Sequence, residues 1–338
     1  MELINRVHAN NIVAWAADKP EVVVLTADLT GSTEVDLFRD EFPGRTFSLG
    51  MAEQNLISWA GGLAREGFTP FVHTFSVFMY RRPYDQLHMS VAYPNLRVRL
   101  FGFLPGITTP GGVTHQAIDD ISTLRGVPNM TLLEVGDATD VESVLDVAQA
   151  VNGPVYVRML RGELPRLFDA NDRMTLNQAR VLTQGDDLLL LSSGICTEEA
   201  MRATQVLQAK GVSIQHMHIT THKPFDDPTV LEALSQTKKA IITMENHTVM
   251  GGLGTNVAEM MATNGIGGKP LVRMGLQDTY AHGASKQYLM KEYKLDAIAL
   301  VRQVEAMLGE SFNISEADLA EVRLEATTSL SKAQLEAL

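Results

Sequence analysis

Short apolar segments alternate with segments of helix length in the first half of the chain. Strand-like runs lie at 22–25, 96–101, 131–135 and 154–159. Residues 140–151 lie between the last two runs, and their apolar positions recur at helical spacing. Strands that alternate with helices predict a parallel sheet built from right-handed crossovers.

A second series of the same kind begins near residue 186. Strands are expected at 188–191, 212–217 and 240–244, and helices at 197–210 and 254–262. The stretch from Arg166 to Gly185 is polar and shows no clear strand, so we place a domain boundary there.

These patterns predict an α/β protein of two domains, each a mostly parallel sheet flanked by helices. The first domain is expected at 1–166 and the second at 182–310. An acidic, amphipathic tail at 311–338 is expected to be helical. There Ser315 precedes acidic and apolar residues in the manner of a helix N-cap.

Composition and charge narrow the functional classes. The chain has 338 residues, 45% of them hydrophobic and 20% charged, which suits a globular protein with a sizeable core. A net charge of −12 argues against nucleic acid as a partner, although a local cluster of donors can still bind a sugar phosphate.

Cysteine content and hydropathy indicate the cellular compartment of the protein. Cys196 is the single cysteine, so no intramolecular disulfide can form, and its apolar surroundings predict a buried core residue. Residues 1–6 do not resemble a signal peptide, and no apolar run approaches the ~20 residues needed to cross a bilayer. We therefore expect a cytoplasmic protein without a membrane partner.

Glu53 is the first candidate for chemistry. It follows a strand-like segment and has apolar residues on both sides, so its carboxylate is at risk of losing its water. From the pattern alone, a solvated acid that stabilises the N-terminus of a helix is the favoured interpretation.

The segment from Gly50 to Gln54 resembles a motif of the transketolase family. In that family a glutamate opens a helix and hydrogen-bonds the aminopyrimidine ring of thiamine diphosphate. The resemblance therefore implies that Glu53 activates this cofactor and that Met51 contacts it. The cofactor would supply the carbanion chemistry, and the protein would supply orientation and electrostatics.

Four further segments of the first domain resemble the same family in the same order. They are Asp28–Ser32, His73–Phe78, Gly111–Gln116 and Met159–Pro165. The roles that the resemblance implies are cofactor contact for Asp28, Phe75 and Phe78, proton transfer at the reacting carbons for His115, and binding of the substrate phosphate for Ser32 and Arg161.

The patterns alone leave purely structural interpretations of these residues open. Phe75 and Phe78 are typical of core aromatics, and His115 of a loop cap. Arg161 is typical of an ion-paired arginine, and Asp28 of a turn residue at a strand end. The second domain resembles the family's C-terminal domain through the segment 244–254.

One family motif is missing. The Gly-Asp-Gly segment that holds the metal and the diphosphate does not occur, and its nearest matches, at 136–138 and 185–187, lack the right context. The resemblance therefore implies a separate partner subunit that carries this half of the site and most of the Mg²⁺ ligands. We expect an α2β2 assembly.

Two departures from the family leave the substrates open. Gly111 stands where the family has an aspartate, and Phe103 where it has a histidine. Ser32, His115 and Arg161 still favour a phosphorylated sugar, because a guanidinium binds phosphate through paired, charge-assisted hydrogen bonds.

The predicted function is therefore that of the C-terminal half of a split transketolase, active only with its partner. It would transfer a two-carbon ketol unit from a phosphorylated ketose to an aldose. Alternatives are the β subunit of a 2-oxo acid dehydrogenase, a 1-deoxyxylulose-5-phosphate synthase-like enzyme, which the segment 81–86 also resembles, and an apulose 4-phosphate transketolase. A non-catalytic regulatory subunit on the same fold is the alternative of another class.

Overall fold

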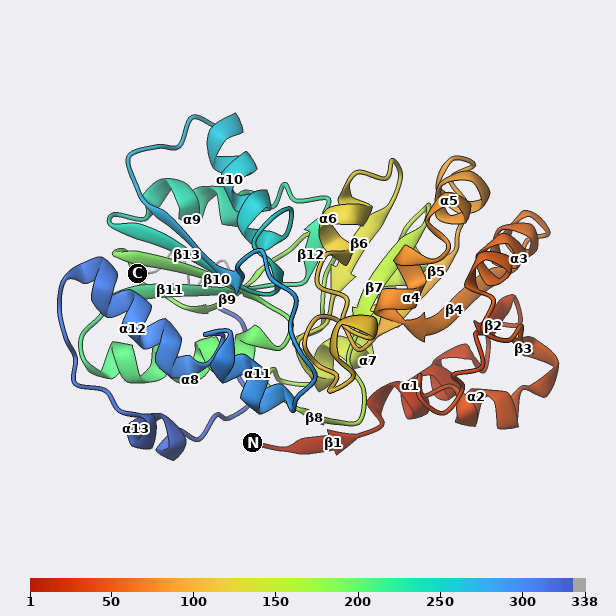
Figure 1. Ribbon diagram of the computed structural model, residues 1–338, viewed down its shortest axis with the longest axis horizontal. Coiled ribbons are helices and arrows are strands. Elements are labelled where there is room, and N and C mark those ends of the chain that lie inside the picture. Colours follow the sequence, from red (N-terminus) through yellow and green to blue (C-terminus); the bar gives the residue numbers. More distant parts are fainter. Residues whose placement is uncertain (331–338) are drawn as a thin grey trace.

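The computed structural model describes residues 1–330 and contains two α/β parts side by side (Figure 1). The N-terminal part runs to β8 and the C-terminal part begins at β9. The first sheet has seven strands in the order β12-β6-β7-β5-β4-β2-β3, and the second has five in the order β14-β13-β10-β11-β9. Only the outer strands β12 and β9 run antiparallel to their neighbours, so the predicted fold class is confirmed.

The first sheet is buried on both faces. Its strands are β2 (Val22–Thr26), β3 (Thr46–Ser48), β4 (Thr69–Phe75), β5 (Arg99–Phe103), β6 (Thr131–Glu134), β7 (Val155–Met159) and β12 (Thr221–Lys223). All five residues of β2, β5 and β7 are buried, as expected of parallel strands covered by helices on both sides. A short antiparallel pair, β1 (Leu3–Asn5) with β8 (Glu163–Pro165), lies outside this sheet.

Two groups of helices cover the faces of the first sheet. One face packs against α1 (Val7–Ala16), α2 (Asp36–Glu41) and α7 (Ala138–Ala150). The other packs against α3 (Glu53–Arg65), α4 (Ser76–Arg81), the π-helical turn Leu87–Ala92 and α6 (Asp120–Arg125), with the short α5 (Tyr84–Gln86) beside the π-helical turn. The sequence of α7 contains both an N-cap and an apolar face, which together favour a helix. The carboxylate of Asp137 accepts from the N–H of Asp140, and the helix buries Val141, Val144 and Leu145 against the sheet.

The second sheet is also sandwiched between helices. Its strands are β9 (Arg180–Thr183), β10 (Leu188–Ser193), β11 (Ile214–Ile219), β13 (Ala240–Thr248) and β14 (Leu271–Leu276). One face packs against α8 (Cys196–Ala209), α11 (Lys286–Glu292) and α12 (Ala297–Leu308), and the other against α9 (Pro228–Gln236) and α10 (Leu253–Thr263). Cys196 is buried at the start of α8, as predicted. Within residues 1–330 no helix has both the length and the apolar character needed to cross a membrane.

The structure corrects the expectation that residues 166–185 contain no strand. Strand β9 lies there and pairs with β11. Its first residue, Arg180, is polar but buried, because Asp140 of the N-terminal part binds its guanidinium at 2.6 Å. A charged residue buried by a distant partner leaves no apolar signal in the local sequence.

The expected helical tail is only partly helical. Helix α13 (Glu316–Glu321) begins after Ser315, which forms the predicted N-cap with Asp318. Val322 and Leu324 then pack against Leu167 and Phe168, and the chain runs non-helically to Leu330. Val322 and Leu324 are buried and the residue between them is exposed, which suits an extended chain rather than a helix. The rest of that prediction, 331–338, lies outside the described residues.

A buried cluster of charges joins the two parts. Arg158 of β7 donates to Asp120 at 2.9 Å, pairs with Glu134, and donates to the carbonyl of Asn246 in β13 at 2.9 Å. His222, from the C-terminal part, lies 2.9 Å from the second oxygen of Glu134. Buried charges are tolerated only when they are paired in this way, so the cluster fixes how the two parts meet.

This cluster controls the ionisation of Glu134. Burial alone would raise the pKa of its carboxyl, but the charge of Arg158 and the hydrogen bond with His222 outweigh burial and lower the pKa to about 2. The carboxylates of Asp120 and Glu134 outweigh the opposing effect of burial on Arg158 and raise its pKa above the ordinary value. Glu134 and Arg158 are therefore both charged at neutral pH.

We expect Arg158→Met to reduce the free energy of unfolding by about 3–5 kcal/mol, because it leaves Glu134 and Asp120 buried without their cation. Urea unfolding followed by circular dichroism measures this loss. Arg173→Met removes an exposed pair with Asp146 and should cost less than about 1 kcal/mol. Equal effects of the two substitutions would contradict the role of the cluster.

Acid should weaken the protein through Glu134. Its pKa is about 2 in the folded state against an ordinary value of 4.5, so its contribution to stability is complete above 4.5 and is lost as the pH falls towards 2. Urea midpoints measured across this window should fall less steeply for Glu134→Gln than for the wild type. The exposed Glu66→Gln should keep the wild-type slope, and an unchanged slope in Glu134→Gln would refute this origin of acid sensitivity.

Candidate active site

The predicted site residues lie where strands of the first sheet end. Phe75 is the last residue of β4, and Arg161 follows β7 by two residues. The turns after β2 and β3 lead to Ser32 and Glu53. These strands are parallel, so their carboxyl ends lie at one edge of the sheet, where ligands of α/β proteins bind.

Glu53 is the first residue of α3 and is only 3% exposed. The turn before it is made by Gly50, whose φ of +70° favours glycine. One carboxylate oxygen of Glu53, Oε1, accepts a hydrogen bond from Arg82 at 2.6 Å. Within residues 1–330 no hydrogen bond is made by the other oxygen, Oε2, so it can still accept one from a ligand.

Aromatic rings connect Glu53 to the middle of the site. The guanidinium carbon of Arg82 lies 3.8 Å from the centre of the Phe78 ring. Phe78 lies 5.9 Å from Phe75, and the ring of His115 lies 5.4 Å from Phe78 and 6.1 Å from Phe75. Both phenyl rings are half-buried, so they form an apolar wall that a ligand can reach.

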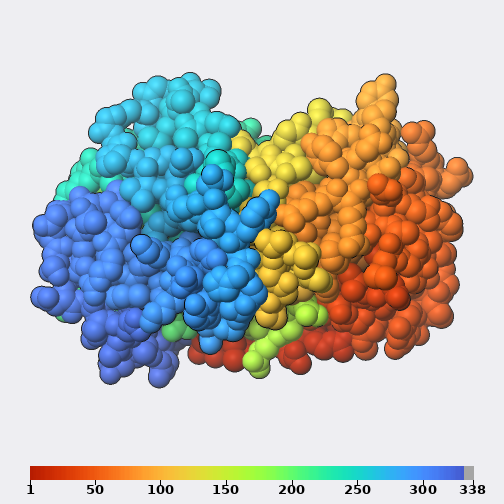
Figure 2. Space-filling model, in the orientation of Figure 1, coloured from red at the N-terminus to blue at the C-terminus, as the bar shows by residue number. Residues whose placement is uncertain are grey.

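The loop that carries His115 is braced against the C-terminal part. Gly112 opens a 3-10 turn with φ of +68°, and a Cβ at this position would lie 3.3 Å from the backbone nitrogen of Gly283. Gln116 donates to the carbonyl of His282 at 3.3 Å. The imidazole itself is held by Thr114, whose hydroxyl lies 2.8 Å from Nδ1. Figure 2 shows the C-terminal part (blue) meeting the N-terminal part (gold and orange) along a continuous boundary.

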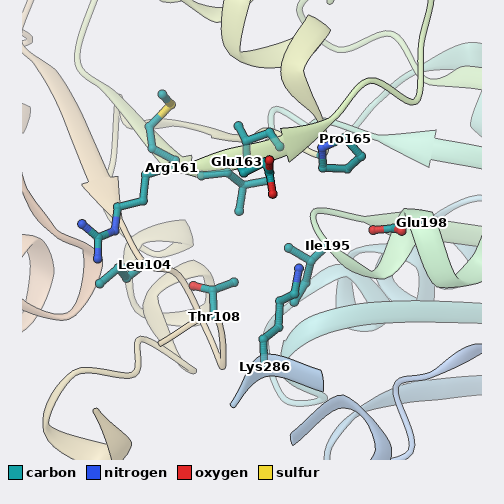
Figure 3. A pocket seen from close by; sticks show the side chains of 12 residues that line it. Leu104, Thr108, Arg161, Glu163, Pro165, Ile195, Glu198 and Lys286 are labelled. Carbon is teal, nitrogen blue, oxygen red and sulfur yellow. The ribbon is translucent and has the colours of Figure 1, made fainter. Parts of the chain in front are cut away.

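Arg161 lies at the other end of the site. Its guanidinium donates to the backbone carbonyl of Ser32 at 3.0 Å and lies 6.0 Å from the centre of the Phe75 ring. Arg161 also lines a cavity of about 200 Å³ between the two parts, together with Thr108 and Lys286 (Figure 3). Contacts therefore run without a break from Glu53 through the aromatic rings to Arg161 and Ser32.

Two predicted residues stand apart from this cluster. Met51 is 80% exposed, and Asp28 is exposed with φ of +60°. In the described part of the chain, no hydrogen bond or ion pair links either side chain to Glu53 or Arg161.

The sequence did not single out Arg82, although it contacts both Glu53 and Phe78. Its partner Glu53 lies 29 residues away, and a contact over that separation leaves no periodic pattern. The resemblance of the segment 81–86 to a thiamine enzyme was the one available signal.

The nearest matches to the missing metal motif have structural roles. Asp137 accepts hydrogen bonds from the N–H groups of Asp140, Leu167 and Phe168 at 2.8–2.9 Å. Asp186 and Asp187 pair with surface lysines. Across residues 1–330, no group of three or more histidine, cysteine, aspartate or glutamate side chains is placed to hold a metal ion.

Two family profiles match the chain. The pyrimidine binding domain of transketolase matches residues 5–166, and the C-terminal domain of transketolase matches residues 177–299.

Relatives of similar length support the match. A transketolase family protein of Sinorhizobium fredii is 36% identical, over 90% of this chain and 88% of its own length. A 6-deoxy-6-sulfo-D-fructose transketolase subunit of Clostridium sp. is 37% identical, over 86% and 90%. A transketolase C-terminal section of Methanocaldococcus jannaschii is 35% identical, over 84% and 89%.

Solved structures share the fold. A split-gene transketolase, described as an inactive β4 tetramer, matches with a TM-score of 0.82 and 33% identity, over 90% of this chain and 97% of its own. A transketolase from Campylobacter jejuni matches with a TM-score of 0.72 and 18% identity, over 47% of its own length. The chain belongs to the transketolase family and contains the family's pyrimidine-binding and C-terminal domains.

Proposed function

We propose that this chain is the C-terminal half of a split, thiamine diphosphate-dependent transketolase that moves a two-carbon ketol unit from a phosphorylated ketose to an aldose. The observation that carries the proposal is the continuous cluster that joins a buried carboxylate, Glu53, to a guanidinium, Arg161, through an aromatic wall. The corresponding division of the chain is a pyrimidine domain at 1–166, a C-terminal domain at 182–310 and a short tail.

The Glu53 end of the cluster fits an aminopyrimidine. A ring nitrogen needs one hydrogen-bond partner, which Oε2 of Glu53 supplies, and the ring needs apolar contact, which Phe75 and Phe78 supply. Bound thiamine diphosphate supplies the nucleophilic carbon of the reaction. Glu53 holds a proton at the pyrimidine nitrogen, and Asp28 and Met51 complete the contacts from the surface of this chain.

The other end of the cluster fits an anionic substrate. Among residues 1–330 the Arg161 guanidinium makes one hydrogen bond, to the Ser32 carbonyl, so within this part of the chain most of its donors remain available for a phosphate. His115 lies between the two ends, against both phenyl rings, where it can move protons to and from substrate hydroxyls.

The diphosphate and its metal require groups of another kind. Mg²⁺ is usually held by one or two carboxylates together with phosphate oxygens. The Gly-Asp-Gly segment that would supply such a site is absent from the sequence, and residues 1–330 contain no group of three or more potential metal ligands. We propose that the separate partner subunit holds Mg²⁺ and the diphosphate in an α2β2 assembly in the cytoplasm. The description of a split-gene relative as an inactive β4 tetramer supports this dependence on a partner.

The second candidate is a 1-deoxyxylulose-5-phosphate synthase-like reaction. Such an enzyme from Geobacter sulfurreducens is 30% identical over 89% of this chain, but the chain spans only 47% of its length. The sulfofructose transketolase relative adds sulfonated ketoses to the donors worth testing. The deciding assay mixes both subunits with thiamine diphosphate and Mg²⁺ and offers xylulose 5-phosphate, 6-deoxy-6-sulfofructose or pyruvate as donor. Two-carbon transfer from xylulose 5-phosphate supports the proposal. If pyruvate reacts and neither ketose does, the proposal is overturned.

Glu53→Gln should lower the rate of two-carbon transfer about 10²–10⁴-fold, because an amide cannot exchange the proton at the pyrimidine nitrogen. Steady-state rates of the two-subunit complex measure the loss. Glu66→Gln, at the far end of α3, is the matched control and should keep full activity. Wild-type rates in Glu53→Gln would reject Glu53 as the cofactor activator.

Arg161→Ala should raise KM for phosphorylated donors about 10–100-fold, the effect of losing hydrogen bonds to a charged group. A ketose without phosphate should react with unchanged KM, and the exposed Arg39→Ala should behave as the wild type with both donors. The phosphate role of Arg161 fails if KM for the phosphorylated donor does not change.

A further inference from the structure

Arg82 contacts the proposed site but has no role in the proposed reaction so far. It follows the last residue of α4, and its side chain is 45% exposed. Its guanidinium nevertheless donates to Oε1 of Glu53 at 2.6 Å, although Glu53 is almost fully buried. The arginine thus reaches from the surface to the one carboxylate on which the site depends.

Three contacts hold Arg82 in place. The ion pair with Glu53 is the first, and the stacking of the guanidinium over Phe78, at 3.8 Å, is the second. The third acts on the backbone, because Gln54, next to Glu53 in α3, donates to the Arg82 carbonyl at 3.3 Å. A planar guanidinium suits both a carboxylate and an aromatic face, so these contacts reinforce one another.

Such an arrangement fixes the orientation of a buried carboxylate. A glutamate without a partner can rotate its carboxyl group, and burial deprives it of the water that would otherwise satisfy it. By binding Oε1, Arg82 restricts this rotation and leaves Oε2 for a ligand. The same guanidinium covers Phe78, so it also holds one ring of the aromatic wall.

We propose that Arg82 is a positioning residue that holds Glu53, and the Phe78 ring beside it, for an aminopyrimidine ligand. This inference rests on the proposed function and adds a residue to it. Arg82 acts through Glu53 and takes no part in proton transfer.

The test is the affinity of the two-subunit complex for thiamine diphosphate in the presence of Mg²⁺, measured by calorimetry without substrate. Arg82→Ala should weaken binding about 10–100-fold, since it removes a hydrogen bond to a charged group. Added guanidinium chloride at millimolar concentration should restore much of the lost affinity, because the free ion can occupy the vacated place beside Glu53. Arg65→Ala, at the exposed end of α3, should bind as the wild type with and without guanidinium.

The outcomes separate this inference from the function on which it rests. Wild-type affinity in Arg82→Ala, or a loss that guanidinium does not restore while the unfolding midpoint is unchanged, overturns the positioning role alone. A fall in the unfolding midpoint that matches the loss of affinity shows a structural arginine and also overturns it. A wild-type complex that does not bind thiamine diphosphate contradicts the proposed function itself.

Discussion

The buried ion cluster around Arg158 is the constraint on which the rest of the structure depends. It pairs one guanidinium with Glu134 and Asp120 and reaches across to Asn246 in the C-terminal part. Charges buried in this way are costly unless every partner is in place, so the two parts have one favourable arrangement. Two site residues lie close to this cluster in the chain. Arg161 lies three residues beyond Arg158, and Asp120 lies five residues beyond His115, so the cluster anchors the loops at the middle and at the Arg161 end of the site.

In the proposed function, this site is one half of a site that two chains share. An acid at one end, a cation at the other and aromatic rings between them suit a planar heterocycle beside an anionic substrate. This surface exposes apolar side chains, because Met51 is exposed and Phe75 and Phe78 are only half-buried. A second chain that carries the diphosphate and metal ligands would both cover it and exclude water, which strengthens the electrostatic interactions inside the site.

Local patterns predicted most of the fold but not its long-range contacts. Continuous apolar runs marked β2 and β10, strand-like runs marked β6 and β7, and helical spacing marked α7, because burial on one face or on both leaves a signal in the local sequence. The missed features depend on partners far away in the chain. Strand β9 is buried through the ion pair of Arg180, and Arg82 reaches Glu53 through space. Resemblance gave the site residues their expected roles, whereas the contacts that orient them join residues far apart in the chain and leave no local pattern.

We propose that this chain supplies only the pyrimidine half of a cofactor site. The most direct test titrates thiamine diphosphate, with and without Mg²⁺, into this chain alone, into the partner chain alone and into their mixture. We expect tight, Mg²⁺-dependent binding in the mixture, with affinity at least about tenfold weaker in either chain alone, a difference of about 1.4 kcal/mol. Equally tight, Mg²⁺-dependent binding by this chain alone would contradict it.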